Sequence, residues 1–200
     1  MSPAKRLSEA ERKREIMEAA TKIITIKGLE NTTMEDIISE TTLSRGGVYH
    51  YYKSVIDIFK DIMIFGIEYR SEIIKSHLNE RNNLSNNQFI AKQIVDKIID
   101  ENPYMPLYVE FLVSKKRIPE LNNIMIELQE RTKESLKTIF DDDSDMLFEP
   151  NSFLFVNDFI NALIVASDIL EARENFKKNR DLLEKMFIYI LERDDYNGSL

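Results

Sequence analysis

A short stretch of this 200-residue chain, residues 43–54, combines residue types that seldom meet in a protein core. It holds two adjacent glycines, an arginine, a lysine, a histidine, three tyrosines and two serines. In a helix each glycine costs about 1 kcal/mol of propensity, so such a helix makes a poor core element. Glycines let a backbone approach another molecule closely, and hydroxyls, cations and a helix N-terminus suit phosphates. We therefore take DNA binding as the leading hypothesis, with a plain loop at Gly46 and Gly47 as the alternative.

Arg45 is the side chain best suited to read a base. A guanidinium can donate two hydrogen bonds to O6 and N7 of guanine, which gives about 1–3 kcal/mol of discrimination between bases. It can equally bind a phosphate, so both roles stay open for Arg45. Nearby, His50 is expected at a polar edge close to DNA, without a catalytic role, and Tyr52 is expected in the core.

Two helices are predicted before this stretch. The first follows Ser8, which forms a capping box with Glu11, and its apolar residues recur at helical spacing until Gly28, where a left-handed stop is expected. The second runs to about residue 40 and buries apolar side chains on one face. Its candidate caps are Thr32 with Glu35 and Thr33 with Asp36.

Two further helices complete the unit. Ser44 is predicted to cap a very short helix that ends near residue 49, and Ser54 with Asp57 is predicted to cap a long one that ends near His77. Two short helices around a turn, with a long helix after them, are typical of a helix-turn-helix unit joined rigidly to a second helical region.

The rest of the chain is also expected to be helical. Helices are predicted at about residues 87–101, 104–114, 119–140, 152–172 and 179–192, with prolines between several of them. The alternation typical of strands is absent from the sequence, so the predicted fold class is all-α.

The last two predicted helices are unusually apolar, and a helix that is apolar on most sides needs cover from more than one neighbour. Burial within the monomer and a homodimer interface both satisfy this requirement, and the DNA hypothesis favours the dimer. The expected interface residues are Phe155, Phe159, Leu163, Leu183, Met186, Phe187 and Ile190.

Composition limits the other possibilities. The chain has no cysteine, which excludes disulfides, thiolate catalysis and thiolate metal sites, and neither a signal peptide nor a membrane-spanning run is recognisable. A cytoplasmic protein is expected. The net charge is −8, but residues 1–60 carry 10 lysines and arginines against 9 acidic residues, so the negative excess lies outside the candidate DNA-binding part.

The N-terminal residues resemble the TetR family of bacterial transcriptional regulators. The match covers about a quarter of the chain. It runs through Ile16-x-x-Ala19-Ala20, Gly28, Thr32-Thr33-Met34-x-x-Ile37 and Leu43-Ser44-Arg45-Gly46-Gly47-Val48-Tyr49-His50-Tyr51-Tyr52-Lys53-Ser54. The resemblance implies a helix-turn-helix DNA-binding domain over residues 1–53. A long fourth helix would join it to a helical effector-binding and dimerisation domain over residues 54–200.

The resemblance also implies which residues meet DNA. Five match positions that commonly contact phosphates in the family, although Tyr49 could instead pack inside the small domain. The expected DNA-binding residues are Thr33, Ser44, Arg45, Gly46, Gly47, Tyr49, His50, Tyr51 and Lys53. One departure is Val55, which stands where the family usually has a phosphate-binding lysine. Free backbone N–H groups at the start of the fourth helix, or the basic residues Lys5, Arg6 and Arg14, could compensate.

By the same resemblance, the protein would be a homodimeric repressor that a small-molecule effector releases from a double-stranded DNA operator. Aromatic or polar residues within apolar helices are the expected ligand contacts. They are Phe65, Tyr69, Tyr104, Met105, Tyr108, Phe111, Asn157 and Asn161. Their character suggests an apolar or aromatic effector, and no cofactor or metal is expected.

Two alternatives come from other classes of protein. Asp141-Asp142-x-x-Asp145 fits an acidic pattern by which some helical enzymes hold magnesium, but the chain lacks a second such cluster and any recognisable catalytic group of residues. A solvated acidic loop and a non-enzymatic protein are therefore expected. The other alternative is a helical ligand-binding or partner-binding protein whose helix-turn-helix no longer engages DNA.

Overall fold

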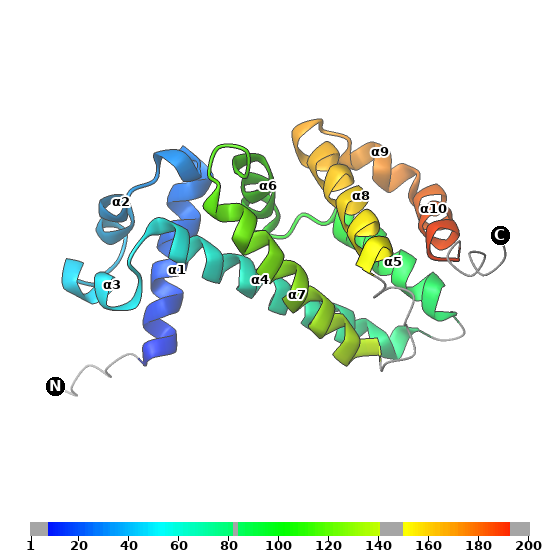
Figure 1. Ribbon diagram of the computed structural model, residues 1–200, viewed down its shortest axis with the longest axis horizontal. Coiled ribbons are helices and arrows are strands. Elements are labelled where there is room, and N and C mark those ends of the chain that lie inside the picture. Colours follow the sequence, from blue (N-terminus) through cyan, green and yellow to red (C-terminus); the bar gives the residue numbers. More distant parts are fainter. Residues whose placement is uncertain (1–7, 82–83, 141–149, 193–200) are drawn as a thin grey trace. The chain divides into compact units, whose positions relative to one another are not determined.

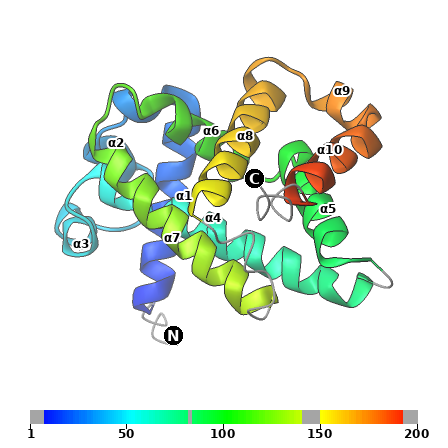
Figure 2. The ribbon, with the colours of Figure 1, turned by 45° about the vertical axis from the view of Figure 1, so that its right-hand side comes forward.

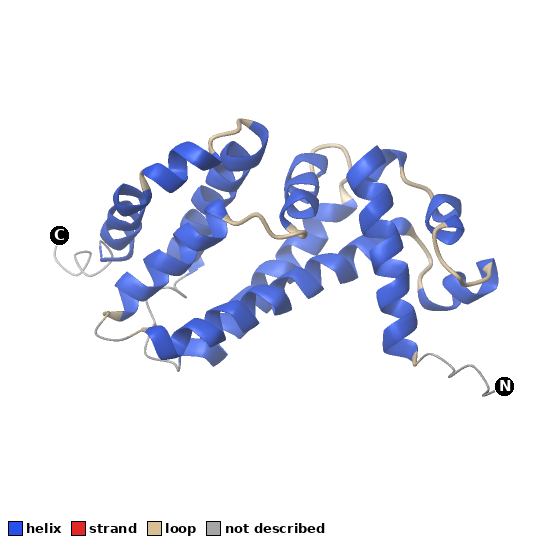
Figure 3. Ribbon diagram, turned by 180° about the vertical axis from the view of Figure 1, so that it is seen from behind, coloured by secondary structure: helices blue, strands red, loops and turns tan. Residues whose placement is uncertain are grey.

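The computed structural model describes residues 8–81, 84–140 and 150–192. All regular secondary structure in these three ranges is helical, as Figure 3 shows, which confirms the predicted all-α class. In the described part of the chain, no helix is both long and apolar enough to cross a membrane. The acidic pattern from Asp141 to Asp145 lies outside the described residues.

Packing divides the chain into two compact units. The first comprises Met1–Gly66 and Pro106–Ile124, and the second comprises Ile67–Met105 and Met125–Leu200. Two helices, α4 (Val55–His77) and α7 (Glu120–Phe140), each contribute residues to both units. The functional boundary expected between residues 53 and 54 stays a prediction.

The first unit begins with the predicted series of capped helices (Figure 1). Helix α1 (Glu9–Lys27) starts at the Ser8–Glu11 capping box and ends at Gly28, whose φ of 76° suits glycine. A single 3-10 turn, η1 (Leu29–Asn31), leads to α2 (Met34–Ser39). Of the two candidate caps, the structure has Thr33 with Asp36.

Helix α3 (Arg45–Tyr51) is two residues longer than predicted, and α4 begins at the expected pair of Ser54 and Asp57. The core beneath these helices is built from apolar side chains that face inward. It includes Ile16, Ala20, Ile24, Ile37, Val48, Ile58 and Phe59, all nearly inaccessible to solvent. Burying such side chains stabilises a fold by roughly 1.5–3 kcal/mol each.

Helix α6 (Met105–Ser114) packs with this N-terminal unit. Its Glu110 Oε1 accepts a hydrogen bond of 2.7 Å from the backbone N–H of Leu29, just after the end of α1. Its Phe111 packs against Phe59 of α4 with ring centroids 6.1 Å apart. A segment far along the sequence therefore helps to fix the end of α1.

The second unit is organised around α5 (Asn86–Ile99), which α8 (Pro150–Ile169), α9 (Arg173–Lys178) and α10 (Arg180–Glu192) contact. Figure 2 shows α10 beside α5. Arg180 Nη2 donates to Asp96 Oδ1 at 2.5 Å, which joins these two helices. The ring of Phe187 on α10 also meets Phe159 on α8 at 5.6 Å.

Two details were absent from the sequence prediction. The helix expected to run to residue 172 ends at Ile169, because Glu171 adopts a left-handed φ of 54° and the chain turns there into α9. A further 3-10 turn, η2 (Leu78–Glu80), follows α4.

Candidate nucleic-acid interface

Helix α3 is a short helix that holds its two glycines in different surroundings. Ser44 caps it, with its Oγ accepting a hydrogen bond of 3.2 Å from the N–H of Gly47, and the buried Val48 anchors it to the core. A Cβ added at Gly46 would meet no atom within 4 Å, whereas one at Gly47 would lie 3.4 Å from Ser44 Oγ. The plain-loop alternative is wrong, and only Gly46 presents a bare backbone outward.

Arg45 lies at the start of α3 with 70% of its side chain exposed. Its Nη2 forms an ion pair of 3.0 Å with Glu35 Oε1 on α2, and its guanidinium lies 5.7 Å from the centroid of the Tyr49 ring. Exposed pairs of this kind contribute at most about 1 kcal/mol, so a DNA group can replace Glu35 at little cost. Glu35 was not among the expected functional residues, because its proximity depends on the turn between α2 and α3.

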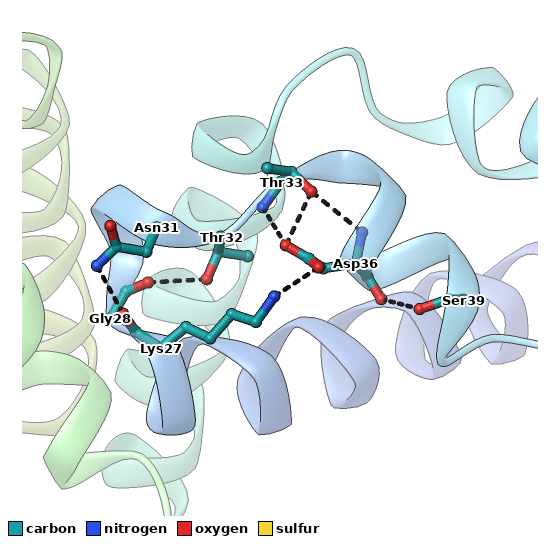
Figure 4. A network of polar contacts seen from close by, with 7 residues as sticks. All are labelled: Lys27, Gly28, Asn31, Thr32, Thr33, Asp36 and Ser39. Carbon is teal, nitrogen blue, oxygen red and sulfur yellow. Dashed lines mark hydrogen bonds and ion pairs between the residues drawn. The ribbon is translucent and has the colours of Figure 1, made fainter.

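Thr33 is embedded in a network of polar contacts at the start of α2, drawn in Figure 4. Its hydroxyl donates to Asp36 Oδ2 at 2.8 Å and accepts from the N–H of Asp36 at 3.2 Å. Lys27 Nζ donates to the other oxygen of Asp36 at 2.6 Å. The hydrogen bonds from Lys27 and then from Thr33 lower the pKa of Asp36 to about 2. A phosphate contact by Thr33 would add to this cap or replace part of it.

The far end of α3 carries the remaining expected contacts. Lys53 is exposed, and its Nζ donates to the backbone carbonyl of Tyr49 at 2.6 Å, which satisfies one of the last carbonyls of the helix. His50 is exposed and meets the ring of Tyr51 edge to face at 4.9 Å. Tyr49 and Tyr51 are each partly exposed, which is compatible with packing and with a contact to DNA.

The turn between α2 and α3 is tied to α1. Glu15 Oε1 accepts from both the N–H and the hydroxyl of Thr42, at 2.5 and 2.7 Å, and these bonds lower the pKa of Glu15. Tyr52 then ends α3 as a core residue, as expected, with its hydroxyl donating to Asp61 Oδ2 at 2.9 Å. Burial, followed by this bond, raises the pKa of Tyr52. These contacts tie the turn before α3 to α1 and the end of α3 to α4.

The start of α4 already has an acceptor of its own. Asp57 Oδ2 accepts from the N–H groups of Lys53 and Ser54, at 3.2 and 2.9 Å. Its carboxylate therefore occupies two donors just before α4, and it adds a negative charge beside the N–H groups of the helix start that could have compensated for Val55. Of the basic residues, Arg14 is exposed and lies 6.0 Å from the centroid of the Phe65 ring, whereas Lys5 and Arg6 fall outside the described residues.

The expected ligand contacts are divided between the two packing units. Tyr69 and Tyr104 pair in the second unit with ring centroids 5.3 Å apart, and Met105, Asn157 and Asn161 belong to the same unit. The others, Phe65, Tyr108 and Phe111, belong to the first unit. Phe111 is fully buried there and stacks on Tyr108 at 6.3 Å. These assignments stay predictions.

The expected dimer residues fall into two sets. Phe155 is 61% exposed and Met186 is 41% exposed, while Phe159, Leu163 and Ile190 are partly exposed. Leu183 and Phe187 are buried within the chain, so they can support an interface only from beneath. Several large apolar side chains of α8 and α10, or just after α8, were not predicted and are also exposed. They are Leu154, Ile169, Leu170, Leu182 and Tyr189.

Comparisons with known proteins agree with this architecture. Residues 16–62 match the family model described as bacterial regulatory proteins, tetR family. A 57-residue segment is 44% identical to an uncharacterized HTH-type transcriptional regulator, YfiR, of Bacillus subtilis (strain 168). This match spans 28% of the chain and 28% of the length of YfiR.

Solved structures extend the likeness to the whole chain. Salmonella enterica GusR is similar with a TM-score of 0.72 at 16% identity, over 94% of this chain and 100% of that one. The fatty acid degradation regulator FadR from Bacillus halodurans gives 0.65 at 10% identity, over 92% and 97%. A TetR-like transcriptional regulator from Rhodococcus sp. RHA1 gives 0.50 at 14% identity, over 94% and 98%. At such identities the likeness is one of fold.

Proposed function

We propose that this chain is a TetR-family regulator, a homodimeric DNA-binding repressor that a small-molecule effector releases from its operator, because its residues 16–62 match the tetR family model. The observation that carries the proposal is the outward-facing start of α3. There the bare backbone of Gly46 lies beside the exposed guanidinium of Arg45 and the Ser44 cap. Binding to chromosomal DNA would place the protein in the cytoplasm.

In the proposed complex, the start of α3 enters the major groove. The missing Cβ of Gly46 permits a close approach, and Arg45 exchanges its bond with Glu35 for a guanine or a phosphate. The hydroxyls of Thr33, Tyr49 and Tyr51, together with Lys53, contact the phosphates on either side. These contacts set the register of the helix in the groove.

A second copy of the chain supplies the second α3. The exposed apolar side chains of α8 and α10, among them Phe155 and Met186, support an interface made by these two helices from each copy. A two-fold dimer that reads two successive major grooves must hold its recognition helices about 34 Å apart. A repressor needs nothing more, since occupancy of a promoter excludes the polymerase.

Release by an effector is supported by the continuity of α4, which follows α3 directly and contributes residues to both units. A ligand that displaces the second half of this helix can alter the separation of the recognition helices. To change occupancy from 99:1 to 1:99, it must favour the non-binding conformation by roughly 5.5 kcal/mol.

The two alternative functions receive less support. The family consists of regulatory proteins, which disfavours the magnesium-dependent enzyme. The match of residues 16–62 to the family model includes α3 with Arg45 and Gly46, which favours a protein that binds DNA.

A gel-shift titration against the promoter region next to the gene tests the proposal. We expect a dimer to bind tightly, with an affinity that falls steeply as salt is raised, because phosphate contacts release counterions. Binding no fragment at low ionic strength, or the same affinity for random DNA as for promoter DNA, would refute it.

A further inference from the structure

Helix α2 directs one of its carboxylates toward α3. Glu35 Oε1 lies 3.0 Å from Arg45 Nη2, and both side chains are exposed, at 58% and 70%. The neighbouring acidic residues are bound in another direction, because Asp36 and the C-cap residue Glu40 pair with lysines of α1. Glu35 is thus the acidic residue of α2 that contacts the side chain proposed to read DNA.

Arg45 occupies a position in which a positive charge does not stabilise the helix. It is the first residue of α3, and the N-terminal end of a helix favours negative charge. The first turn of α3 contains no acidic residue. The carboxylate of Glu35, which comes from another helix, therefore offsets the charge of Arg45 in the free protein.

The ion pair uses a small part of what the guanidinium can donate. Arginine carries five N–H donors in a planar fork, and Glu35 pairs with Nη2. The ring of Tyr49, one helical turn further along α3, lies 5.7 Å from the guanidinium. The guanidinium therefore has an anion and an aromatic ring as neighbours, and a DNA group must compete with the anion.

Phosphate and guanine differ in how they compete with Glu35. A phosphate replaces one anion with another, and its negative charge repels the carboxylate that it releases. Guanine offers two uncharged acceptors, O6 and N7, so Arg45 can make two hydrogen bonds in place of its contact with Glu35. Opening the ion pair for guanine costs little, because exposed ion pairs are weak.

We propose that Glu35 is a specificity-determining residue, which withholds Arg45 from phosphates and leaves it available to guanine. The inference rests on the proposed function and narrows the partner of Arg45 from a guanine or a phosphate to a guanine. On DNA that lacks a guanine at the matching position, Arg45 stays paired with Glu35. At the operator the ion pair opens and Arg45 binds the base.

Replacing the carboxylate with its neutral amide tests the proposal. In Glu35→Gln the side chain keeps its size and loses its charge, so Arg45 becomes available to phosphates. We expect the affinity for random DNA to rise roughly fivefold or more at low salt, because one phosphate contact is added. The affinity for the best sequence selected from random DNA should rise by less than about twofold, since only a weak ion pair is lost.

The salt dependence gives a second measurement on the same proteins. An added phosphate contact should steepen the slope of log affinity against log salt by about 0.9 on random DNA and leave the slope on the selected sequence unchanged. Fluorescence anisotropy with both DNAs over a series of salt concentrations measures the affinities and the slopes. A carboxylate that only offsets the charge at the start of α3 would not change the slope.

Glu127→Gln is the matched control. It removes the same charge from an exposed ion pair on α7, where Glu127 Oε1 lies 3.2 Å from Arg131 Nη2. Because salt screens a charge that lies away from the bound DNA, both affinities should stay within about twofold of the wild type. The control thus separates a contact at α3 from the general effect of one negative charge less.

The same change in the Arg45→Ala background shows whether Glu35 acts through Arg45. There Glu35→Gln should no longer raise the affinity for random DNA, because no guanidinium is released. An equal rise in both backgrounds would mean that Glu35 repels phosphates directly, and it would overturn the proposal. Loss of the fold in Glu35→Gln would make the ion pair structural and would equally overturn it.

The wild-type protein separates this inference from the function on which it rests. If the wild type binds neither DNA, the regulator is refuted, and the inference with it. If the wild type prefers the selected sequence and Glu35→Gln keeps the same ratio of affinities, the regulator stands and the role of Glu35 is refuted.

Discussion

Helix α3 and helix α4 each carry an arginine with polar contacts, but Arg45 and Arg70 are held in opposite ways. Arg45 is largely exposed and pairs with Glu35 across the surface, whereas Arg70 is desolvated and donates to the backbone of α5. An exposed, weakly paired guanidinium suits a partner that competes in water, such as a DNA groove. A desolvated one that donates to a backbone carbonyl suits a structural role, because it satisfies that acceptor and joins α4 to α5.

In the proposed complex, α3 binds DNA as one of a pair. A substitution at the dimer face is therefore expected to have the largest effect on operator binding. Phe155→Glu places a charge on the exposed apolar side of α8, where Phe155 stacks on Phe159. We expect the dissociation constant of the dimer to rise by roughly 30-fold or more and operator binding to be lost in parallel. Sedimentation velocity at several protein concentrations measures this dissociation constant. Ile26→Glu, at an exposed apolar site on α1, is the control and should leave the dimer intact.

The second-largest effect on operator binding is expected from removal of the exposed guanidinium of Arg45. Arg45→Ala should weaken operator binding by about 10-fold to 100-fold, corresponding to about 1–3 kcal/mol, and weaken binding to random DNA much less. Fluorescence anisotropy with both DNAs at fixed salt measures the two affinities. Arg131→Ala removes an exposed arginine of α7 and should change neither. An equal loss on both DNAs would make Arg45 a phosphate contact.

The two glycines provide a finer distinction within α3. Gly46→Ala meets no atom in the free protein and should raise the free energy of unfolding by about 0.5–1 kcal/mol, yet it should weaken operator binding. Gly47→Ala places its methyl 3.4 Å from Ser44 Oγ, so it should gain less stability. Urea unfolding and anisotropy on the same preparations test this. If Gly46→Ala binds the operator as tightly as the wild type, the backbone at Gly46 does not approach the DNA closely.

The smallest effect concerns the cap of α2. The pKa of Asp36 is lowered to about 2 from 3.8, so its contribution to stability is present above pH 3.8 and is lost as the pH falls toward 2. Asp36→Asn should therefore be less stable than the wild type near neutral pH and converge with it in acid. Urea unfolding at a series of pH values measures the difference. A constant gap between the two proteins across this range would contradict the assignment.

Much of the first unit could be predicted because its signals are local. The pairs of Ser8 with Glu11 and of Ser54 with Asp57 lie three residues apart, and both form as expected. The left-handed end of α1 likewise follows from Gly28 alone. In such places the sequence neighbour is also the structural partner.

Other features depend on segments that meet only after folding. Glu35 reaches Arg45 across a turn that Glu15 of α1 holds in place, and Arg70 reaches the backbone of Gln93 on another helix. Helical spacing carries no signal for such contacts. For the same reason, the expected ligand residues are divided between two packing units. The sequence pattern of an aromatic residue in an apolar helix is the same whether the residue lies in a core or in a binding site.

In the proposed complex, two copies of α3, each with Gly46 near its start, enter successive major grooves of one DNA site. Selection of bound sequences from random DNA, followed by footprinting of the best one, tests it most directly. We expect a two-fold symmetric site whose half-sites lie about 34 Å apart and whose protection disappears in Phe155→Glu. Selection of no sequence, or protection of a single asymmetric site by the monomer, would contradict it.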